Sequence, residues 1–308
     1  MPELPEVETI SKDLNKKIPG LKIRDFWTDF KAGKGLGKNI QLPPDIGKFK
    51  KEIISRKILK VYRKGKNILI DLSGGKLLLI HQKMTGHLLI GKWQINKVKS
   101  LKLKVQSLVS GEMQEKVNNY IHAIFYLSNG RQLALSDLRK FAKIMAGDKD
   151  KIEALPDLKN LGPDPLELTE KEFVEILNKQ KGKIKQILMD QEILSGIGNI
   201  YSDEILWFAK IHPFARVEKL SNKNLKNIYK YTRQVLKEAI KLRGASISDY
   251  RDPEGKSGGY DKIRRVYRRE GEKCPSTSLG TGLYCNGIIK RIKIGGRSAH
   301  FCSKCQKL

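Results

Sequence analysis

The placement of the cysteines constrains this chain more than any other feature of its sequence. All four, Cys274, Cys285, Cys302 and Cys305, lie in the last 35 of the 308 residues, so no disulfide framework can hold the rest of the chain together. Cys302 and Cys305 form a Cys-x2-Cys pair, a spacing at which one tight turn supplies two tetrahedral zinc ligands. We therefore predict one structural Zn²⁺ ion bound by the four cysteines.

The first cysteine pair departs from the usual spacing. Ten residues separate Cys274 from Cys285, whereas removal of the eight residues STSLGTGL would leave two, so we interpret STSLGTGL as an insertion. After Cys285, the segment IIKRIKIGGRSAHF predicts a β-hairpin with a Gly-Gly turn. Two alternatives remain open: a metal-free hairpin with reduced thiols, or a site in which His300 replaces a cysteine.

The charge of the chain points to a polyanionic partner. There are 61 Lys and Arg residues against 33 Asp and Glu, a net charge of +28, which favours nucleic acid or an anionic membrane surface. A lysine-rich protein without such a partner is the alternative. No apolar run approaches the roughly 20 residues of a membrane span, and the first residues resemble neither a signal nor a transit peptide. We expect a cytoplasmic nucleic-acid-binding protein with no membrane association.

Hydrophobic periodicity predicts an α+β protein. Apolar residues at three- and four-residue steps predict a helix over 3–18, and alternating segments between Gly and Asn-Gly turns predict an antiparallel β-sandwich or barrel over 21–145. Within the latter, 94–118 is interpreted as a lengthened polar hairpin. After a Pro- and Asp-rich stretch the periodicity becomes helical, at 169–178, 183–192, 200–209 and 221–243. The expected organisation is a β-sandwich domain (1–146), a linker (147–168), a helical domain (169–265) and a zinc-binding hairpin (266–308).

Three short segments carry candidate binding chemistry. The turn containing Gly196, Gly198 and Asn199 opens a helix, and its free N–H groups can bind a phosphate, although a plain interhelical turn would look similar. In HQKMTGHL and SDLRKFAKI, Met84 and Phe141 follow strands and lie beside basic residues or glycine. Minor-groove-binding proteins insert such apolar wedges between base steps, although core packing is the commoner role of either residue alone.

Taken together, these segments resemble the formamidopyrimidine-DNA glycosylases of bacterial base-excision repair. MPELPEVET, RKGKNIL, HQKMTGHL, LGPDPL, GIGNIYSDEILW and GGRSAHFCSKCQ resemble that family in the same order and span nearly the whole chain. The related endonuclease VIII-like glycosylases usually have Gly where this chain has Leu4, so the oxidised-purine branch is the better fit. The resemblance implies a helix–two-turn–helix fold for the helical domain.

The resemblance also implies the catalytic residues. Removal of Met1 would leave Pro2 with a secondary α-amine, and an α-amino group titrates near about 7.7–8.0, so part of it is a neutral nucleophile. Attack on the sugar C1′ would give a permanently cationic iminium, an electron sink for elimination. Glu3 would carry a proton, and Glu6 would orient or relay. Lys66 would contact phosphate and the damaged base.

Further residues are implied to contact DNA, which must expose the damaged nucleotide by base flipping. Residues 244–260 match a flexible loop that closes over the flipped base, and Lys183 is the best match to a lysine near the lesion pocket. The phosphate-binding positions match His81, Asn199 and Arg297. The residues that fill the gap left by the flipped nucleotide match Met84, Arg139 and Phe141, with Arg139 reading an opposite cytosine.

The implied function is a bifunctional glycosylase and AP lyase that removes 8-oxoguanine and formamidopyrimidines from damaged double-stranded DNA and nicks it by β,δ-elimination. It would act as a monomer in the bacterial cytoplasm, on the nucleoid. There are two alternatives: a glycosylase that prefers oxidised pyrimidines, and a protein that binds damaged DNA without catalysis. A metal-dependent nuclease is disfavoured, because no carboxylate cluster in the sequence has metal-ligand spacing.

Overall fold

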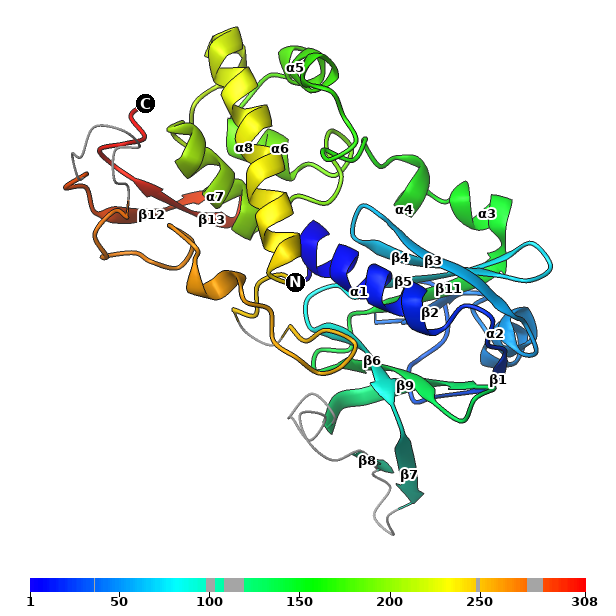
Figure 1. Cartoon of the computed structure of the whole chain (residues 1–308). Coiled ribbons are helices and arrows are strands. Elements are labelled where there is room, and N and C mark those ends of the chain that lie inside the picture. The colour runs from blue at the N-terminus through cyan, green and yellow to red at the C-terminus, as the bar shows by residue number, and fades with distance from the viewer. Residues whose placement is uncertain (36, 98–102, 108–118, 248–249, 276–284) are drawn as a thin grey trace. The chain divides into compact units, whose positions relative to one another are not determined.

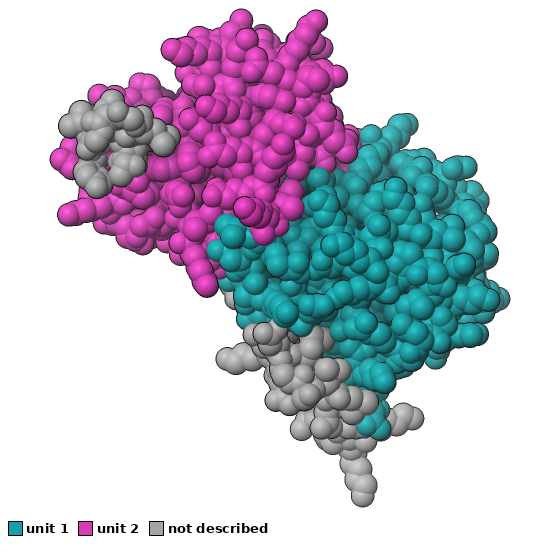
Figure 2. All heavy atoms as spheres, viewed as in Figure 1, with its two compact units in different colours: residues 1–159, 242–259 teal, residues 160–241, 260–308 magenta. Residues whose placement is uncertain are grey.

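The computed structural model describes residues 1–35, 37–97, 103–107, 119–247, 250–275 and 285–308 (Figure 1). The chain folds into two compact units, coloured separately in Figure 2: unit 1 comprises 1–159 and 242–259, and unit 2 comprises 160–241 and 260–308. No helix in the described ranges has the length and apolar character that a membrane span requires.

Unit 1 begins with helix α1 (Leu4–Lys17), which confirms the helix predicted near the N-terminus. Proline in the first turn has a preset φ and no N–H to satisfy, which favours helix initiation there. Val7, Ile10 and Leu14 are fully buried and form one apolar stripe. Through this stripe α1 packs against strand β3 (Ile58–Lys64) and enters the core of unit 1.

Two sheets form the rest of the unit 1 core. The first is four-stranded, in the order β1 (Ile23–Thr28), β9 (Ile121–Leu127), β10 (Gln132–Asp137), β6 (Gly86–Gly91). The second is five-stranded, in the order β2 (Ile40–Leu42), β11 (Lys143–Asp148), β5 (Lys76–His81), β4 (Asn67–Leu72), β3 (Ile58–Lys64). Both sheets contribute to one hydrophobic cluster, as in a β-sandwich. The sheets are antiparallel except that β2 pairs with β11 in parallel.

Successive side chains of a strand point to opposite faces of its sheet, so every second residue enters this core. The shared cluster contains Ile68 and Ile70 of β4 and, from the other sheet, Leu88 and Ile90 of β6. Leu89, between the latter two, lies in a second cluster on the opposite face of the sheet. Helices α2 (Ile46–Ile53), α3 (Lys149–Glu153) and α4 (Pro156–Lys159) also belong to unit 1. Strands β7 (Trp93–Lys97) and β8 (Leu103–Ser107) pair where the lengthened hairpin was expected; the remainder of that hairpin lies outside the described residues.

Residues 242–259 return to unit 1 although the chain has by then entered unit 2. Tyr250 is buried in the unit 1 core, and the Ile90 N–H donates to the Pro253 carbonyl at 2.8 Å. The Arg243 guanidinium contacts the carboxylates of Asp13 on α1 and of Asp252. The segment matched to a flexible lesion loop is thus anchored at several points to the N-terminal part of the chain.

Unit 2 combines helices with a β-hairpin. Its helices are α5 (Glu170–Asn178), α6 (Ile184–Met189), α7 (Asn199–Ala209) and α8 (Asn222–Lys241), with short 3-10 turns at Val217–Lys219 and Tyr260–Lys262. The hairpin is β12 (Ile289–Ile294) and β13 (Arg297–Cys302), joined by Gly295 and Gly296. Both glycines have positive φ, as a two-residue hairpin turn requires, so the predicted Gly-Gly turn is confirmed.

Candidate catalytic residues, DNA-binding residues and zinc centre

The start of the chain buries acidic side chains. Pro2 is buried, and Glu3 and Glu6 are only 2% and 1% exposed. Glutamate is almost never fully buried unless it has partners, so burial of both at a helix start needs a specific reason. Lys66, in the turn between β3 and β4, is also buried, at 7% exposure. Buried ionisable groups of this kind are typical of functional sites.

Glu6 makes specific contacts through both carboxylate oxygens. Its Oε2 accepts the Glu3 N–H at 2.7 Å, and its Oε1 accepts the Ala245 N–H at 2.7 Å. Gly244, at φ +85°, lies so close that a Cβ there would be 2.6 Å from Glu6 Oε1. Glu6 therefore connects the helix start to residues 244–245, and its role in orienting or relaying a proton stays a prediction.

His81 is surrounded by cations. It ends β5, in register with Asn67 on β4 and Lys143 on β11. Burial, followed by the charges of Lys83 and Lys66, lowers the pKa of His81 to about 3 from 6.5. Its Nδ1 accepts the Lys83 N–H at 3.0 Å. A neutral imidazole beside several ammonium groups is suited to an anion such as a DNA phosphate.

The lowered pKa of His81 predicts a pH dependence of stability. The unfolded chain takes up a proton at His81 near pH 6.5, but the folded chain does so only near pH 3, so acid favours unfolding in this window. Between pH 7 and 5.5 we expect the wild type to lose about 1 kcal/mol more of its unfolding free energy than His81→Gln. Urea unfolding at both pH values measures this. Equal losses in the two proteins would contradict it.

The predicted wedge residues lie on two loops of unit 1, the first wedge loop (82–85, between β5 and β6) and the second wedge loop (138–142, between β10 and β11). Met84 is 37% exposed and Phe141 is 49% exposed, so neither packs in the core. The Arg139 guanidinium lies 4.5 Å from the Phe141 ring centroid. The exposure excludes core packing as the role of these two side chains, and their role as wedges stays a prediction. Leu138, in the second wedge loop, is also an exposed apolar residue, at 52%, and the sequence analysis did not single it out.

In unit 2, two turns connect α6 to α7 as a helix–two-turn–helix. Gly196 has φ +98°, and its N–H donates to the Gln191 side chain at 2.9 Å. Gly198 caps α7, and Asn199 is its first residue. The Asn199 Oδ1 is buried and has no hydrogen-bond partner among the described residues. Asn199 also lines a pocket of about 530 Å³, together with two arginines, Arg268 and Arg291, and with Tyr267 and three further polar residues. Arg297 is exposed at the tip of the hairpin.

A buried ion pair in unit 2 was missed by sequence reasoning. Lys185 and Asp203 are both 0% exposed, with Nζ and Oδ1 2.5 Å apart. The other Asp203 oxygen accepts the His300 N–H at 2.9 Å and lies 3.0 Å from His300 Nδ1, which connects α6, α7 and β13. The Lys183 ammonium lies 4.3 Å from the Phe214 ring centroid, and the place of Lys183 near the lesion stays a prediction. In the KQKGKIK run only the tertiary structure distinguishes these lysines.

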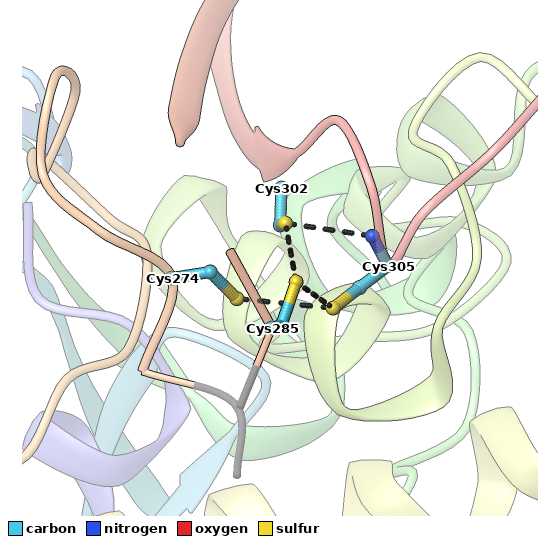
Figure 3. A group of neighbouring side chains, drawn as sticks. All are labelled: Cys274, Cys285, Cys302 and Cys305. Atoms are coloured by element: carbon cyan, nitrogen blue, oxygen red, sulfur yellow. Dashed lines mark hydrogen bonds between the residues drawn. The ribbon is translucent and has the colours of Figure 1, made fainter. Parts of the chain in front are cut away.

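The four cysteine side chains converge at the end of the hairpin (Figure 3). Their sulfur atoms all lie within 4.8 Å of one another, and Cys285 Sγ is 3.1 Å from Cys305 Sγ and 3.6 Å from Cys302 Sγ. Tetrahedral Zn–S bonds of about 2.3 Å place neighbouring sulfurs about 3.8 Å apart, so the cluster fits one zinc ion. His300 is not in this cluster.

Backbone pairing explains how the widely spaced first pair of cysteines meets. Cys274 N–H donates to the Gly287 carbonyl at 2.8 Å, and Lys273 bridges to Ile288, so the chain on either side of STSLGTGL is held together. The insertion itself lies outside the described residues. Two N–H groups also point at sulfur: Trp207 Nε1 to Cys274 Sγ and Cys305 N to Cys302 Sγ, each at 3.4 Å. Such donors orient thiolate ligands around a metal.

Gly287 leaves no room for a side chain beside the cysteines. A Cβ there would lie 2.4 Å from Cys302 Sγ and 3.2 Å from Cys285 Sγ. We expect Gly287→Ala to displace a ligand sulfur and to weaken zinc affinity by about 10-fold or more, the scale of a disturbed outer shell. Competition with a colorimetric zinc chelator measures this. Gly147→Ala in β11 is the control, because Gly147 has no positive φ and a Cβ there would make only an ordinary contact, 3.8 Å from Ile152. Equal affinity in Gly287→Ala and the wild type would show that the sulfurs tolerate the methyl group.

Comparisons with known proteins agree with this geometry. Residues 1–144 match the formamidopyrimidine-DNA glycosylase N-terminal domain, 161–251 its H2TH domain, and 271–308 the zinc finger found in FPG and IleRS. A formamidopyrimidine-DNA glycosylase of Pelotomaculum thermopropionicum is 37% identical over 315 residues, and one of Desulforamulus reducens is 35% identical over 310; each comparison covers at least 99% of both chains. The Lactococcus lactis Fpg bound to abasic-site DNA superposes with a TM-score of 0.80 at 30% identity, over 99% of this chain and 100% of that one.

The fold and the site thus define a DNA-repair glycosylase with a zinc finger, whose four cysteines are placed to bind one structural zinc ion. The chain belongs to the formamidopyrimidine-DNA glycosylase family.

Proposed function

We propose that this glycosylase excises oxidised purines, 8-oxoguanine and formamidopyrimidines, from duplex DNA, with the Pro2 amine as its nucleophile. The observation that carries the proposal is the burial of Pro2, Glu3 and Glu6 at the start of the chain, where Glu6 bonds the Glu3 N–H; Lys66 is buried as well. Burial excludes water from the place where charge would develop, which strengthens every electrostatic interaction there.

In the proposed reaction the Pro2 nitrogen attacks C1′ as the N-glycosidic bond breaks, and the base leaves with a proton. The Pro2 nitrogen then loses its proton, and the C1′–O4′ bond of the sugar breaks with O4′ taking up a proton, which leaves a cationic iminium at C1′. This iminium makes the C2′ hydrogen acidic. Loss of that proton expels the 3′-phosphate, and a second elimination expels the 5′-phosphate. Glu3 is the proposed proton carrier, Glu6 orients the helix start, and Lys66 contacts phosphate and the lesion.

The proposed DNA contacts extend over both units. Residues 1–146 would act as the catalytic domain, 169–265 as the DNA-binding domain with its lesion loop, and 266–308 as the zinc-finger hairpin, after a linker at 147–168. Phosphates would be bound by His81, the turn of Gly196, Gly198 and Asn199, and Arg297. Met84, Arg139 and Phe141 would fill the gap, with Lys183 near the lesion. The enzyme would act as a monomer in the cytoplasm, on nucleoid DNA.

Oxidised pyrimidines are the second candidate substrate. The Lactococcus lactis protein, 30% identical to this chain, has been solved both with Fapy-dG DNA and with DNA containing an oxidised pyrimidine. Leu4, in the position where the endonuclease VIII-like branch usually has Gly, favours purines.

Borohydride trapping on matched duplexes tests the proposal. We expect a covalent adduct on a duplex with 8-oxoguanine opposite cytosine and on an abasic duplex. An adduct on the abasic duplex alone would leave the lyase activity and redirect the substrate to pyrimidine lesions. No adduct on either would overturn the proposed nucleophile and favour DNA binding without catalysis.

A further inference from the structure

We propose that Asp137 is a positioning residue that joins the two wedge loops, so that Met84, Arg139 and Phe141 enter DNA as one preformed unit. This inference rests on the proposed function. Asp137 ends β10, opposite Gly86 at the start of β6, so it lies where the two loops leave the same sheet. It is 0% exposed.

The Asp137 carboxylate accepts hydrogen bonds from both loops. Its Oδ2 accepts the N–H groups of Phe141 and Ala142 at 2.7 Å each. Its Oδ1 accepts the Arg139 N–H at 3.2 Å and the Thr85 hydroxyl at 2.5 Å. The ionised form offers about four acceptor sites, so one side chain can satisfy all of these donors.

Thr85 completes the connection between the loops. It follows Met84 in the chain, and its Oγ1 also accepts the Arg139 N–H at 3.1 Å. The residue next to the first wedge side chain is therefore bonded both to Asp137 and to the backbone of the second wedge loop. Movement of either loop alone would break these bonds.

Asn39 holds the second wedge loop through its carbonyl groups. Its Nδ2 donates to the carbonyls of Lys140 and Ala142 at 2.8 Å each, and its side chain is buried. Lys140 adopts φ +52°, a conformation rare for a residue with a side chain. The loop is thus bonded at its N–H groups by Asp137 and at its carbonyls by Asn39.

Preformed geometry matters most where a base must be pushed out of the stack. A loop that had to become ordered on binding would lose conformational entropy at that step, which lowers affinity. The proposed role therefore predicts that Asp137 affects base eversion and gap filling more than the chemistry at C1′. An abasic site has no base to extrude, so its cleavage should depend less on the wedge.

The test compares two reactions in matched variants. In Asp137→Asn the amide group would face N–H donors, and in Thr85→Val the hydroxyl is lost at nearly constant volume. For both variants we expect single-turnover excision of 8-oxoguanine opposite cytosine to slow by about 10-fold, the scale of a lost hydrogen bond to a charged group. The rate of abasic-site cleavage should stay within about 2-fold of the wild type. Thr85→Ser keeps the hydroxyl and should restore excision. Asp71→Asn, at a carboxylate that pairs with Tyr62 and Lys149 in the same unit, is the control and should match the wild type.

Equal slowing of both reactions, or no slowing of either, would overturn the role of Asp137 in eversion. Thr85→Val keeps the test decisive where Asp137→Asn fails to fold. Amide hydrogen exchange of the free protein gives an outcome independent of activity. We expect faster exchange at residues 139–142 in Asp137→Asn and Thr85→Val, and unchanged exchange would contradict the proposal. A wild type that excises neither lesion class would overturn the proposed function instead.

Discussion

Replacing Pro2 with glycine is expected to reduce the borohydride-trapped adduct on an 8-oxoguanine duplex by roughly 100-fold or more, the scale of losing a catalytic group. A glycine amine can still attack C1′, but its imine can lose a proton and become neutral. The iminium of proline has no such proton, so it stays cationic throughout the eliminations. The measurement is the single-turnover rate of adduct formation, with binding to an uncleavable abasic analogue measured in parallel.

The matched control for Pro2→Gly is Pro5→Ala. Pro5 is also buried, in the first turn of α1, but it lies within the helix and has no α-amine to offer. We expect Pro5→Ala to trap within about 2-fold of the wild type, because alanine suits a helix well. Binding of the abasic analogue should be nearly unchanged in both variants. Full trapping by Pro2→Gly, or an equal loss in Pro5→Ala, would contradict the proposed role of the Pro2 amine.

Replacing Cys305 with alanine is expected to remove the zinc ion and to weaken binding of duplex DNA by about 100-fold, since the phosphate contacts proposed for the hairpin would be lost. The hairpin β12–β13 is short, and the cysteine cluster joins it to the segment that contains Cys274. Without the metal, this junction would depend on the backbone bond from Cys274 to Gly287 and on the apolar cluster of Trp207, Val266 and Ile289. Zinc content by atomic spectroscopy and DNA affinity at fixed salt measure the two effects.

Ser303→Ala is the matched control for the zinc prediction, because Ser303 lies between Cys302 and Cys305 without belonging to the cluster. It should keep one zinc ion per chain and wild-type affinity. Saturating concentrations of Cys305→Ala should still form the trapped adduct on an abasic duplex, since Pro2 is intact. Normal DNA affinity in a zinc-free variant would show that the hairpin contributes little to binding.

The sequence by itself determined the local features of this protein. The periodicity of the first residues predicted α1, the Gly-Gly pair predicted the hairpin turn, and the Cys-x2-Cys pair predicted the metal site. Each depends on residues a few positions apart, whose spacing follows directly from helix, strand or turn geometry. The family motifs added the identity of the enzyme because they occur in one order along the chain.

Tertiary structure alone decided how distant residues meet. The hydrogen bond from Ala245 to Glu6 joins residues 239 positions apart, and that from Thr85 to Asp137 joins residues 52 apart. No pattern in the sequence predicted the parallel pairing of β2 with β11. The same holds for the burial of Lys185, whereas the ammonium of nearby Lys183 lies over an aromatic ring. Such contacts depend on which faces of separate elements pack together, and a carboxylate at a strand end has the same local sequence whether its partners lie across a loop or in solvent.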